Sequence, residues 1–337
     1  MEFDFNKAKE LCRQANKILI CSHSNPDGDA IGSVLGLYHA LNREVNAELK
    51  MMVPNDFPGF LKWMPGADRI IIHELKQDIS SSYIQEADLI FCLDFNDIDR
   101  VESCSKDLLA SSATKILIDH HPSPKPQFDL VYSTIQTSST AELVYQFIGS
   151  FNKSEMLGRE AAIGLYTGIM TDTGSFSYLC NNESTYLAVA KLISAGVDAE
   201  EAHRQVYDTY SSHRLQLLGF CLSERLVILK KYHTAYIYLS QADLERFNYQ
   251  VGDIEGVVNY PLSIREVKFA VLFREQNGKI RLSLRSKGTF AVNEFAREHF
   301  AGGGHRNAAG ADSFDKLQKT LQKFEALLPQ YMQQLSV

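Results

Sequence analysis

The stretch KILICSHSNPDGDAIGSVLGLYHALN, residues 17–42, begins with an apolar run, passes through a polar turn and continues with apolar residues at helical spacing. The run at residues 17–22 has the length of a buried strand. Pro26 and Gly28 make its connection to the helical pattern tight. A strand that leads directly into a helix is a building unit of parallel sheets covered by helices, so this stretch predicts an α/β fold.

Apolar runs and helical patterns continue to alternate through the first half of the chain, and from about Leu226 the pattern changes to alternating strands followed by a terminal helix. We therefore expect an N-terminal, mainly parallel sheet flanked by helices and a smaller C-terminal α+β domain. The expected divisions are a domain at 1–196, a stiff helical connector at 197–225 and a domain at 226–337. The predicted strands are 17–22, 47–53, 69–72, 89–94, 115–119, 227–240, 266–275 and 279–286, and the predicted helices are 30–42, 140–149, 159–170, 184–195 and 315–335.

The charge is unevenly distributed along the 337 residues, whose formal net charge is −7. Residues 1–222 contain 18 basic and 29 acidic side chains, whereas residues 223–337 contain 16 basic and 12 acidic ones. Such a division would suit an enzyme that holds cations in its first half and an anionic substrate in its second. Charge alone does not establish this, because the halves of many proteins differ as much by chance.

Several features favour a cytoplasmic protein that does not associate with membranes. The longest apolar stretches fall short of the roughly 20 residues that span a bilayer, and the N-terminal pattern is charged, unlike a signal peptide. The six cysteines are scattered, without a CxxC motif, which predicts buried free thiols in a reducing compartment. The sequence leaves the oligomeric state open, a homodimer included.

Side chains of the kinds that bind metals follow three of the predicted strands. His23, Asp27 and Asp29 lie within seven positions after the first strand, close enough to converge on one point, and Asp29 sits where the N-cap of the helix is expected. Asp94 and the triplet Asp119-His120-His121 end two further apolar runs. Ligands of open α/β sheets bind at the carboxyl ends of the strands, so these residues predict a single site there.

The acidic residues of this predicted site need compensating positive charge. Asp172 ends a predicted helix, a position that disfavours a carboxylate unless a cation lies nearby. Four carboxylates and two neutral imidazoles would be balanced by two divalent cations, and the mixed nitrogen and oxygen donors favour Mn²⁺ or a related ion. Paired cations of this kind catalyse in-line phosphoryl displacement, which predicts hydrolysis of a phosphate ester. The expected ligands are His23, Asp27, Asp29, Asp94, His120 and Asp172.

The basic half contains two further motifs, RLSLRSKG at 281–288 and GGGHRNAAG at 302–310. A glycine-rich loop lets backbone N–H groups approach an anion closely, and Arg285 offers a planar fork that fits phosphate oxygens. Either motif by itself is also typical of an ordinary strand or turn.

As a set, these motifs resemble the DHH phosphoesterase family with its DHHA1 domain. The motifs occur in the same order as in that family across nearly the whole chain. The two-domain length resembles the branch of nanoRNases that also act as phosphatases on 3′-phosphoadenosine 5′-phosphate. This resemblance implies a fold of a DHH domain and a DHHA1 domain and a substrate that is a short single-stranded RNA or a small nucleotide.

The resemblance also implies roles for individual residues. His23, Asp27 and Asp94 would hold one Mn²⁺; Asp29, Asp94, His120 and Asp172 would hold the other, with Asp94 shared and a bridging hydroxide as the nucleophile. His121 would face the substrate phosphate, and Asp119 would orient the His121 ring. The residues implied to grip the far end of the nucleotide are Arg285, Ser286, Gly303, Gly304 and His305.

Other functions remain open at this point. The same chemistry would serve linear or cyclic di-adenosine nucleotides, and the metal motifs are shared with inorganic pyrophosphatases and exopolyphosphatases. A nucleotide sensor without catalysis is disfavoured by the intact set of ligands. Long DNA is disfavoured as a partner because the net charge is acidic.

Overall fold

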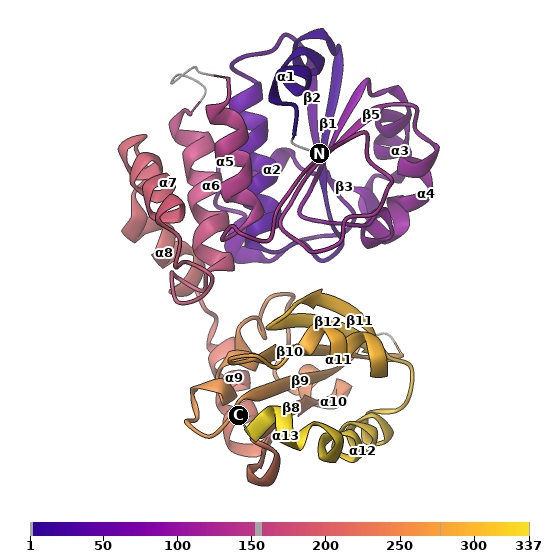
Figure 1. Ribbon diagram of the computed structural model, residues 1–337, viewed down its shortest axis with the longest axis vertical. Coiled ribbons are helices and arrows are strands. Elements are labelled where there is room, and N and C mark those ends of the chain that lie inside the picture. Colours follow the sequence, from indigo (N-terminus) through magenta and orange to yellow (C-terminus); the bar gives the residue numbers. More distant parts are fainter. Residues whose placement is uncertain (1–2, 152–156, 277, 337) are drawn as a thin grey trace. The chain divides into compact units, whose positions relative to one another are not determined.

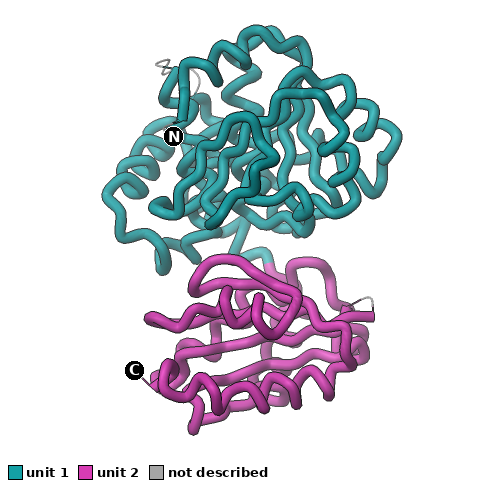
Figure 2. The backbone as a smooth tube through the Cα atoms, turned by 45° about the vertical axis from the view of Figure 1, so that its right-hand side comes forward, with its two compact units in different colours: residues 1–209 teal, residues 210–337 magenta. Residues whose placement is uncertain are grey.

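The computed structural model of the chain describes residues 3–151, 157–276 and 278–336. The chain divides into two compact units, unit 1 at residues 1–209 and unit 2 at residues 210–337 (Figure 2). The predicted connector contains α8 (Ala199–Tyr207), which belongs to unit 1, and α9 (Ser212–Glu224), which belongs to unit 2. That this segment acts as a stiff connector stays a prediction.

Unit 1 is built on a parallel sheet of six strands in the order β3-β2-β1-β4-β5-β6, with helices on both faces (Figure 1). This confirms the predicted α/β class. The elements of unit 1 besides α8 are α1 (Phe5–Gln14), β1 (Lys17–Ser22), α2 (Gly28–Leu41), β2 (Glu48–Val53), β3 (Ile71–Ile72), α3 (Gln77–Glu86), β4 (Leu89–Leu93), α4 (Ser105–Ala110), β5 (Thr114–Asp119), β6 (Leu130–Ser133), α5 (Thr140–Gly149), α6 (Arg159–Asp172) and α7 (Glu183–Ser194).

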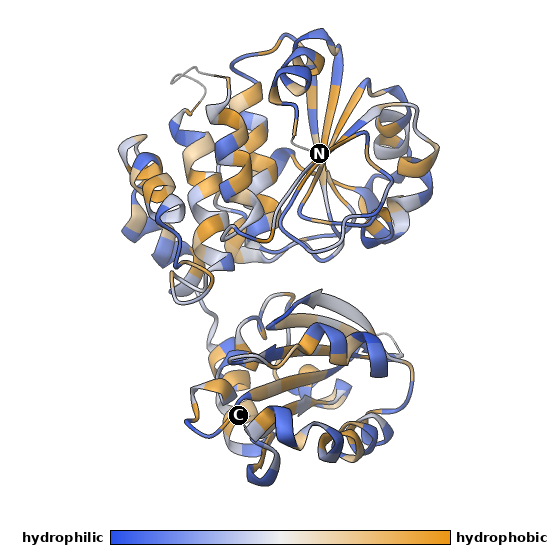
Figure 3. Cartoon of the chain, viewed as in Figure 1, coloured by the Kyte–Doolittle hydropathy of each residue, from blue (hydrophilic) through white to orange (hydrophobic). Residues whose placement is uncertain are grey.

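The central strands are apolar on both faces because both faces are covered (Figure 3). Along β1, Ile18 and Ile20 pack into the core cluster that includes residues of α2, α5 and α6. Leu19 and Cys21 point the other way, into a cluster with residues of α3 and α4. Strands buried on both faces read as continuous apolar runs, which is why β1, β4 and β5 were visible in the sequence.

Helices α2 and α6 approach each other closely through small residues. A Cβ atom on Gly32 would lie 2.4 Å from the carbonyl oxygen of Gly164, so only glycine fits there. Closer to the ends of the helices, a Cβ atom on Gly28 would lie 2.2 Å from Oγ1 of Thr171, so the N-terminal end of α2 is packed against the C-terminal end of α6. This packing therefore brings the segment that carries Asp29 to the helix end that carries Asp172.

Two predictions in unit 1 need correction. The strand predicted at 69–72 is reduced to β3 because residues 67–69 form a 3₁₀ turn. Three elements were not predicted: α3, α4 and the edge strand β6. The sequence of α3, QDISSSYIQE, is rich in serine, and β6 is only partly buried, so neither shows a strong apolar period.

Unit 2 is built on a mixed sheet in the order β11-β12-β10-β9-β8-β7, as the α+β prediction requires. Only β8 and β9 run parallel; the other neighbours are antiparallel. Its elements besides α9 are β7 (Leu226–Leu229), β8 (Thr234–Leu239), α10 (Gln241–Arg246), β9 (Phe269–Gln276), β10 (Lys279–Ser286), α11 (Val292–His299), β11 (Ala301–His305), β12 (Ala308–Ser313), α12 (Leu317–Leu327) and α13 (Met332–Ser336).

Three predictions in unit 2 also need correction. The run at 227–240 is two strands, because residues 230–232 form a 3₁₀ turn that ends at His233 with a positive φ of 48°. The terminal helix is interrupted by a 3₁₀ turn that contains Pro329, since proline removes a backbone donor. The triple glycine lies in a strand, β11, and not in a loop.

None of the described helices is long and apolar enough to cross a membrane.

Candidate metal centre

The candidate site lies at the carboxyl edge of the unit 1 sheet, where three neighbouring strands end. His23 follows β1, Asp94 follows β4 and His120 follows β5. Asp94 has a positive φ of 66°, which turns the chain sharply as it leaves β4, while its N–H still donates to the carbonyl oxygen of Ile118 at 3.1 Å. A non-glycine residue held in this region is strained, and such residues cluster at functional sites.

One group of donors consists of His23, Asp27 and Asp94, whose ligand-type atoms all lie within 4.8 Å of one another. The Nε2 atom of His23 is 3.3 Å from Oδ2 of Asp94, and its Nδ1 atom is 2.9 Å from the carbonyl oxygen of Ser24. Asp27 is the N-cap of α2, since its carboxylate accepts from the backbone of Asp29 and Ala30. The prediction that Asp29 is the N-cap was therefore wrong by two positions.

A second group consists of Asp29, His120 and Asp172, again within 4.8 Å. The Nε2 atom of His120 lies 3.8 Å from Oδ2 of Asp29, 3.6 Å from Oδ2 of Asp172 and 3.5 Å from Oδ1 of Asp94. Asp94 thus has Oδ2 near the first group and Oδ1 near the second. The three residues His23, Asp27 and Asp29, expected to converge on one point, are divided between the two groups.

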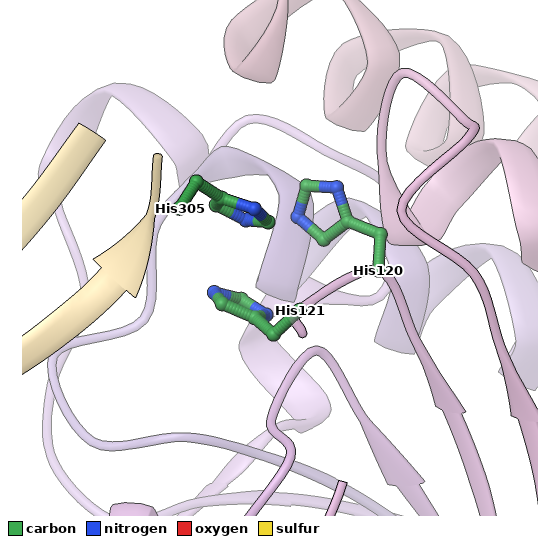
Figure 4. A group of neighbouring side chains, drawn as sticks. All are labelled: His120, His121 and His305. Atoms are coloured by element: carbon green, nitrogen blue, oxygen red, sulfur yellow. The ribbon is translucent and has the colours of Figure 1, made fainter. Parts of the chain in front are cut away.

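His121 is held by a carboxylate behind it. Its Nδ1 atom donates to Oδ1 of Asp119 at 2.8 Å and lies 3.6 Å from Oδ1 of Asp94. The rings of His120 and His121 leave the end of β5 turned by 79° relative to each other (Figure 4). Asp119 is fully buried and fixes the orientation of the His121 ring, so the geometry agrees with the orienting role expected for it.

The electrostatics of the site show carboxylates crowded together. Burial raises the pKa of Asp29 well above its usual range, and the nearby charges of Asp94 and Asp172 raise it further. Burial and the charge of Asp94 raise the pKa of Asp119 to about 7. Burial also acts to raise the pKa of Asp94, but the hydrogen bond to His23 and the charges of His23, His120 and Arg100 together lower it. Divalent cations would relieve this repulsion, and the imidazole and carboxylate donors fit such ions.

Comparison with known proteins identifies the family. The DHH family, N-terminal domain, matches residues 17–169, and the DHHA1 domain matches residues 230–334. The chain is 32% identical over 300 residues to the probable bifunctional oligoribonuclease and PAP phosphatase NrnA of Streptococcus mutans, which covers 88% of this chain and 89% of that protein. The chain belongs to the DHH family.

Solved structures resemble this DHH protein over most of its length. An exopolyphosphatase-related protein from Bacteroides fragilis superposes with a TM-score of 0.93 and 41% identity, covering 99% of this chain and 97% of that one. RecJ from Thermus thermophilus, in complex with Mn²⁺, shares the fold, with a TM-score of 0.58 and 15% identity over 99% of this chain and 55% of RecJ. As a member of this family, this DHH protein is a phosphoester hydrolase.

Sequence reasoning missed the residues that hold the carboxylates of the candidate metal centre of this DHH protein in place. The N-terminal end of α5 faces them: the backbone N–H groups of Thr140 and Ala141 donate to the two carboxylate oxygens of Asp29, at 2.7 and 2.8 Å. The hydroxyl of Thr140 donates to Oδ1 of Asp94 at 2.9 Å. Thr140 therefore contacts a carboxylate of each donor group.

Glu142, which is fully buried, anchors the turn that precedes α5. Its Oε2 atom accepts from the backbone and hydroxyl of Ser138 at 3.0 and 2.7 Å and from the hydroxyl of Thr185 at 2.8 Å. Ser139 caps the helix by accepting from the N–H of Glu142. The sequence Ser-Thr-Ala-Glu at 139–142 is a capping-box pattern, which was the available signal for these residues.

Replacing Thr140 by valine should weaken metal binding while the fold is kept. Valine has nearly the same shape but loses the hydroxyl that donates to Asp94, and lost supporting contacts of this kind typically cost about 10- to 100-fold in metal affinity. Titration of the purified variant with Mn²⁺ measures this affinity. Thr140→Ser should restore it, and Thr234→Val, which removes a buried hydroxyl in unit 2, is the matched control. Unchanged affinity in Thr140→Val would remove Thr140 from the account.

The predicted substrate residues of unit 2 do not all share one surface. Arg285 and Ser286 are neighbours on β10 and so point to opposite faces of the sheet. Ser286 is buried, donates to the carbonyl oxygen of Phe290 at 2.7 Å and accepts from the side chain of Asn307 at 2.9 Å. Its hydroxyl therefore serves the packing of unit 2, which leaves Arg285, on the opposite face of β10, as the candidate.

The glycines predicted to grip the nucleotide, Gly303 and Gly304, lie on the edge strand β11, which ends at His305 (Figure 4). A Cβ atom on Gly304 would lie 2.7 Å from the carbonyl oxygen of Ala308, and its φ is +137°, so the β11–β12 turn itself requires glycine there. A Cβ atom on Gly303 would meet only a side-chain atom of Arg297, at 3.8 Å. The triple glycine is thus explained in part by the strand pairing alone.

Proposed function

We propose that this DHH protein hydrolyses the phosphate esters of short oligoribonucleotides and removes the 3′-phosphate of 3′-phosphoadenosine 5′-phosphate (PAP). The observation that carries the proposal is the position of Asp94, which offers one carboxylate oxygen to each of two donor groups. The name of the Streptococcus mutans relative, an oligoribonuclease and PAP phosphatase, supports the choice of substrate.

The proposed ligands are divided as the two groups suggest. His23, Asp27 and Asp94 would hold one divalent cation, and Asp29, Asp94, His120 and Asp172 would hold the other, with Mn²⁺ as the expected ion. Bound cations would supply Lewis acidity, which lowers the pKa of a coordinated water and stabilises charge on the phosphoryl group. Thr140 and Ala141 keep Asp29 fixed during this reaction.

The proposed role of His121 follows from its contact with Asp119. Because Nδ1 donates to that carboxylate, Nε2 is the ring atom directed away from it, toward the substrate phosphate in the proposed role. Held in this way, the His121 ring would stabilise negative charge or donate a proton to the leaving oxygen. Arg285 of unit 2 would hold a phosphate of the nucleotide through its planar fork.

A second candidate function is hydrolysis of polyphosphate or pyrophosphate. It is favoured by one observation, the name of the Bacteroides fragilis protein, which is called exopolyphosphatase-related and is 41% identical to this chain. The same metal centre would serve either class of substrate, because both reactions transfer a phosphoryl group to water.

A substrate panel separates these functions. Phosphate and nucleotide release would be measured with Mn²⁺ from a dinucleotide, a five-residue RNA, PAP, linear and cyclic di-adenosine nucleotides, pyrophosphate and polyphosphate. We expect fast release from the RNA substrates and PAP. The Asp94→Asn protein, purified in the same way, controls for contaminating enzymes. Preference for the di-adenosine nucleotides, or for pyrophosphate or polyphosphate, would contradict the proposed substrate while leaving the metal centre in place.

A further inference from the structure

Two arginines lie side by side on adjacent strands of the unit 2 sheet. Arg274 on β9 and Arg281 on β10 are paired residues of an antiparallel ladder, so their side chains leave the same face of the sheet. Like charges in such a position destabilise the pairing. A feature that costs stability without a structural gain is where a function should be sought.

The charges around this pair are incompletely balanced. Lys279 and Arg281 share one carboxylate, Asp312, at 2.7 and 3.5 Å. The guanidinium of Arg274 instead contacts two neutral groups, the hydroxyl of Tyr249 and the side-chain oxygen of Gln276. Among the described residues no ion pair joins Arg274 to a carboxylate, whereas Lys279 and Arg281 are both paired with Asp312.

Glu275, the acidic residue next to Arg274 in the chain, does not supply a negative charge to the guanidinium of Arg274. It pairs with Ile280 in the ladder, so it points to the opposite face of the sheet from Arg274. Its Oε2 atom accepts from the backbone N–H of Gln241 at 2.8 Å. Arg281 keeps 37% of its side chain exposed, so an anion from solution can reach its guanidinium.

The arginine pair lies on the same face of β10 as Arg285. Ile280, Leu282 and Leu284 point into the unit 2 core, which leaves the alternate residues, Arg281 among them, on the other face. Residues 281 and 285 are about 13 Å apart along the strand. That separation exceeds the distance between the two phosphates of one nucleotide such as PAP.

We propose that Arg274 and Arg281 form a second phosphate-binding site. It holds one backbone phosphate of an oligoribonucleotide that has another phosphate bound at Arg285. Two adjacent guanidinium groups can share one phosphate through several charge-assisted hydrogen bonds, and the bound anion offsets their repulsion. This inference rests on the proposed function, because the ligand is an RNA. The second site distinguishes an oligonucleotide from a single nucleotide.

The test compares long and short ligands in the Arg281→Gln variant of the full chain with Mn²⁺ present. Binding of a five-residue phosphorothioate RNA, which resists hydrolysis, should weaken about tenfold, the loss expected for one charge-assisted contact. The dependence of log Kd on log salt should decrease by roughly one phosphate contact. The KM for PAP should remain that of the wild type.

Matched variants separate this role from a structural one. Arg281→Lys should recover part of the RNA affinity, and Lys231→Gln, which removes another exposed cation of unit 2, should have no effect on the RNA. Wild-type RNA affinity in Arg281→Gln, or an equal loss for PAP and RNA, would overturn the second site. If the proposed function itself is wrong, the wild-type protein will neither bind the RNA nor act on PAP. That result would overturn both the proposed function and the second phosphate site.

Discussion

Replacing Asp94 by asparagine is expected to reduce phosphate release by about 10³-fold or more, since even one electrostatic group lost from an active site costs 10²- to 10³-fold. The loss should be larger here because Asp94 lies within reach of both donor groups, with Oδ2 near His23 and Oδ1 near His120. The amide keeps the shape of the side chain but removes its charge. Two quantities are measured: turnover with saturating Mn²⁺, and the metal content of the protein by mass spectrometry.

The control for this variant is Asp99→Asn, which removes an exposed carboxylate from the same loop region. It should retain the turnover and the metal content of the wild type. If Asp94→Asn kept its full metal content and lost less than tenfold in rate, Asp94 would not be a shared ligand, and the two-group interpretation would be wrong.

Replacing His121 by alanine should reduce turnover by about 10²- to 10⁴-fold, the usual contribution of a positioned acid or base, while metal content stays close to that of the wild type. The reason is that Nδ1 of His121 contacts Asp119, whereas His23 and His120 are the imidazoles of the two proposed ligand groups. His121 also lies in a group of possible donors with Asp94 and Asp119, so the metal content decides between the two roles. Metal analysis and steady-state kinetics on the same preparation test both halves of this expectation.

His213→Ala removes an exposed histidine and serves as the comparison for nonspecific effects. A His121→Ala protein that loses its metals would move His121 into the ligand set. Normal turnover in that variant would instead remove any role for the Asp119–His121 contact in the reaction.

The fold of unit 1 could be predicted from the sequence because its central strands are buried on both faces. Runs such as residues 18–21 and 89–93 are then apolar at every position, and the polar residues that follow each run mark the edge of the sheet. The same logic predicted the donor residues, because parallel strands bring their carboxyl ends to one edge. Elements with mixed polarity, such as α3 and β6, carry no such signal.

The parts that could not be predicted depend on contacts between distant segments. Thr140 meets Asp29 and Asp94 across 111 and 46 positions of the chain, and nothing in the local pattern around Thr140 specifies these partners. The Arg274–Arg281 pair depends on strand register, which the turn between β9 and β10 sets. The triple glycine predicts a loop because glycine is rare in strands, yet it lies in a strand whose close pairing with β12 requires glycine at 302 and 304.

The central claim is that two adjacent groups of donors, sharing Asp94, hold two divalent cations that hydrolysis requires. The most direct measurement is the number of Mn²⁺ ions bound per chain at equilibrium, determined in parallel with turnover as the ion is titrated into protein treated with a chelator. The account predicts two ions per chain and turnover that appears only as the second ion binds. One ion or none at saturation, or full turnover in the chelator, would contradict it.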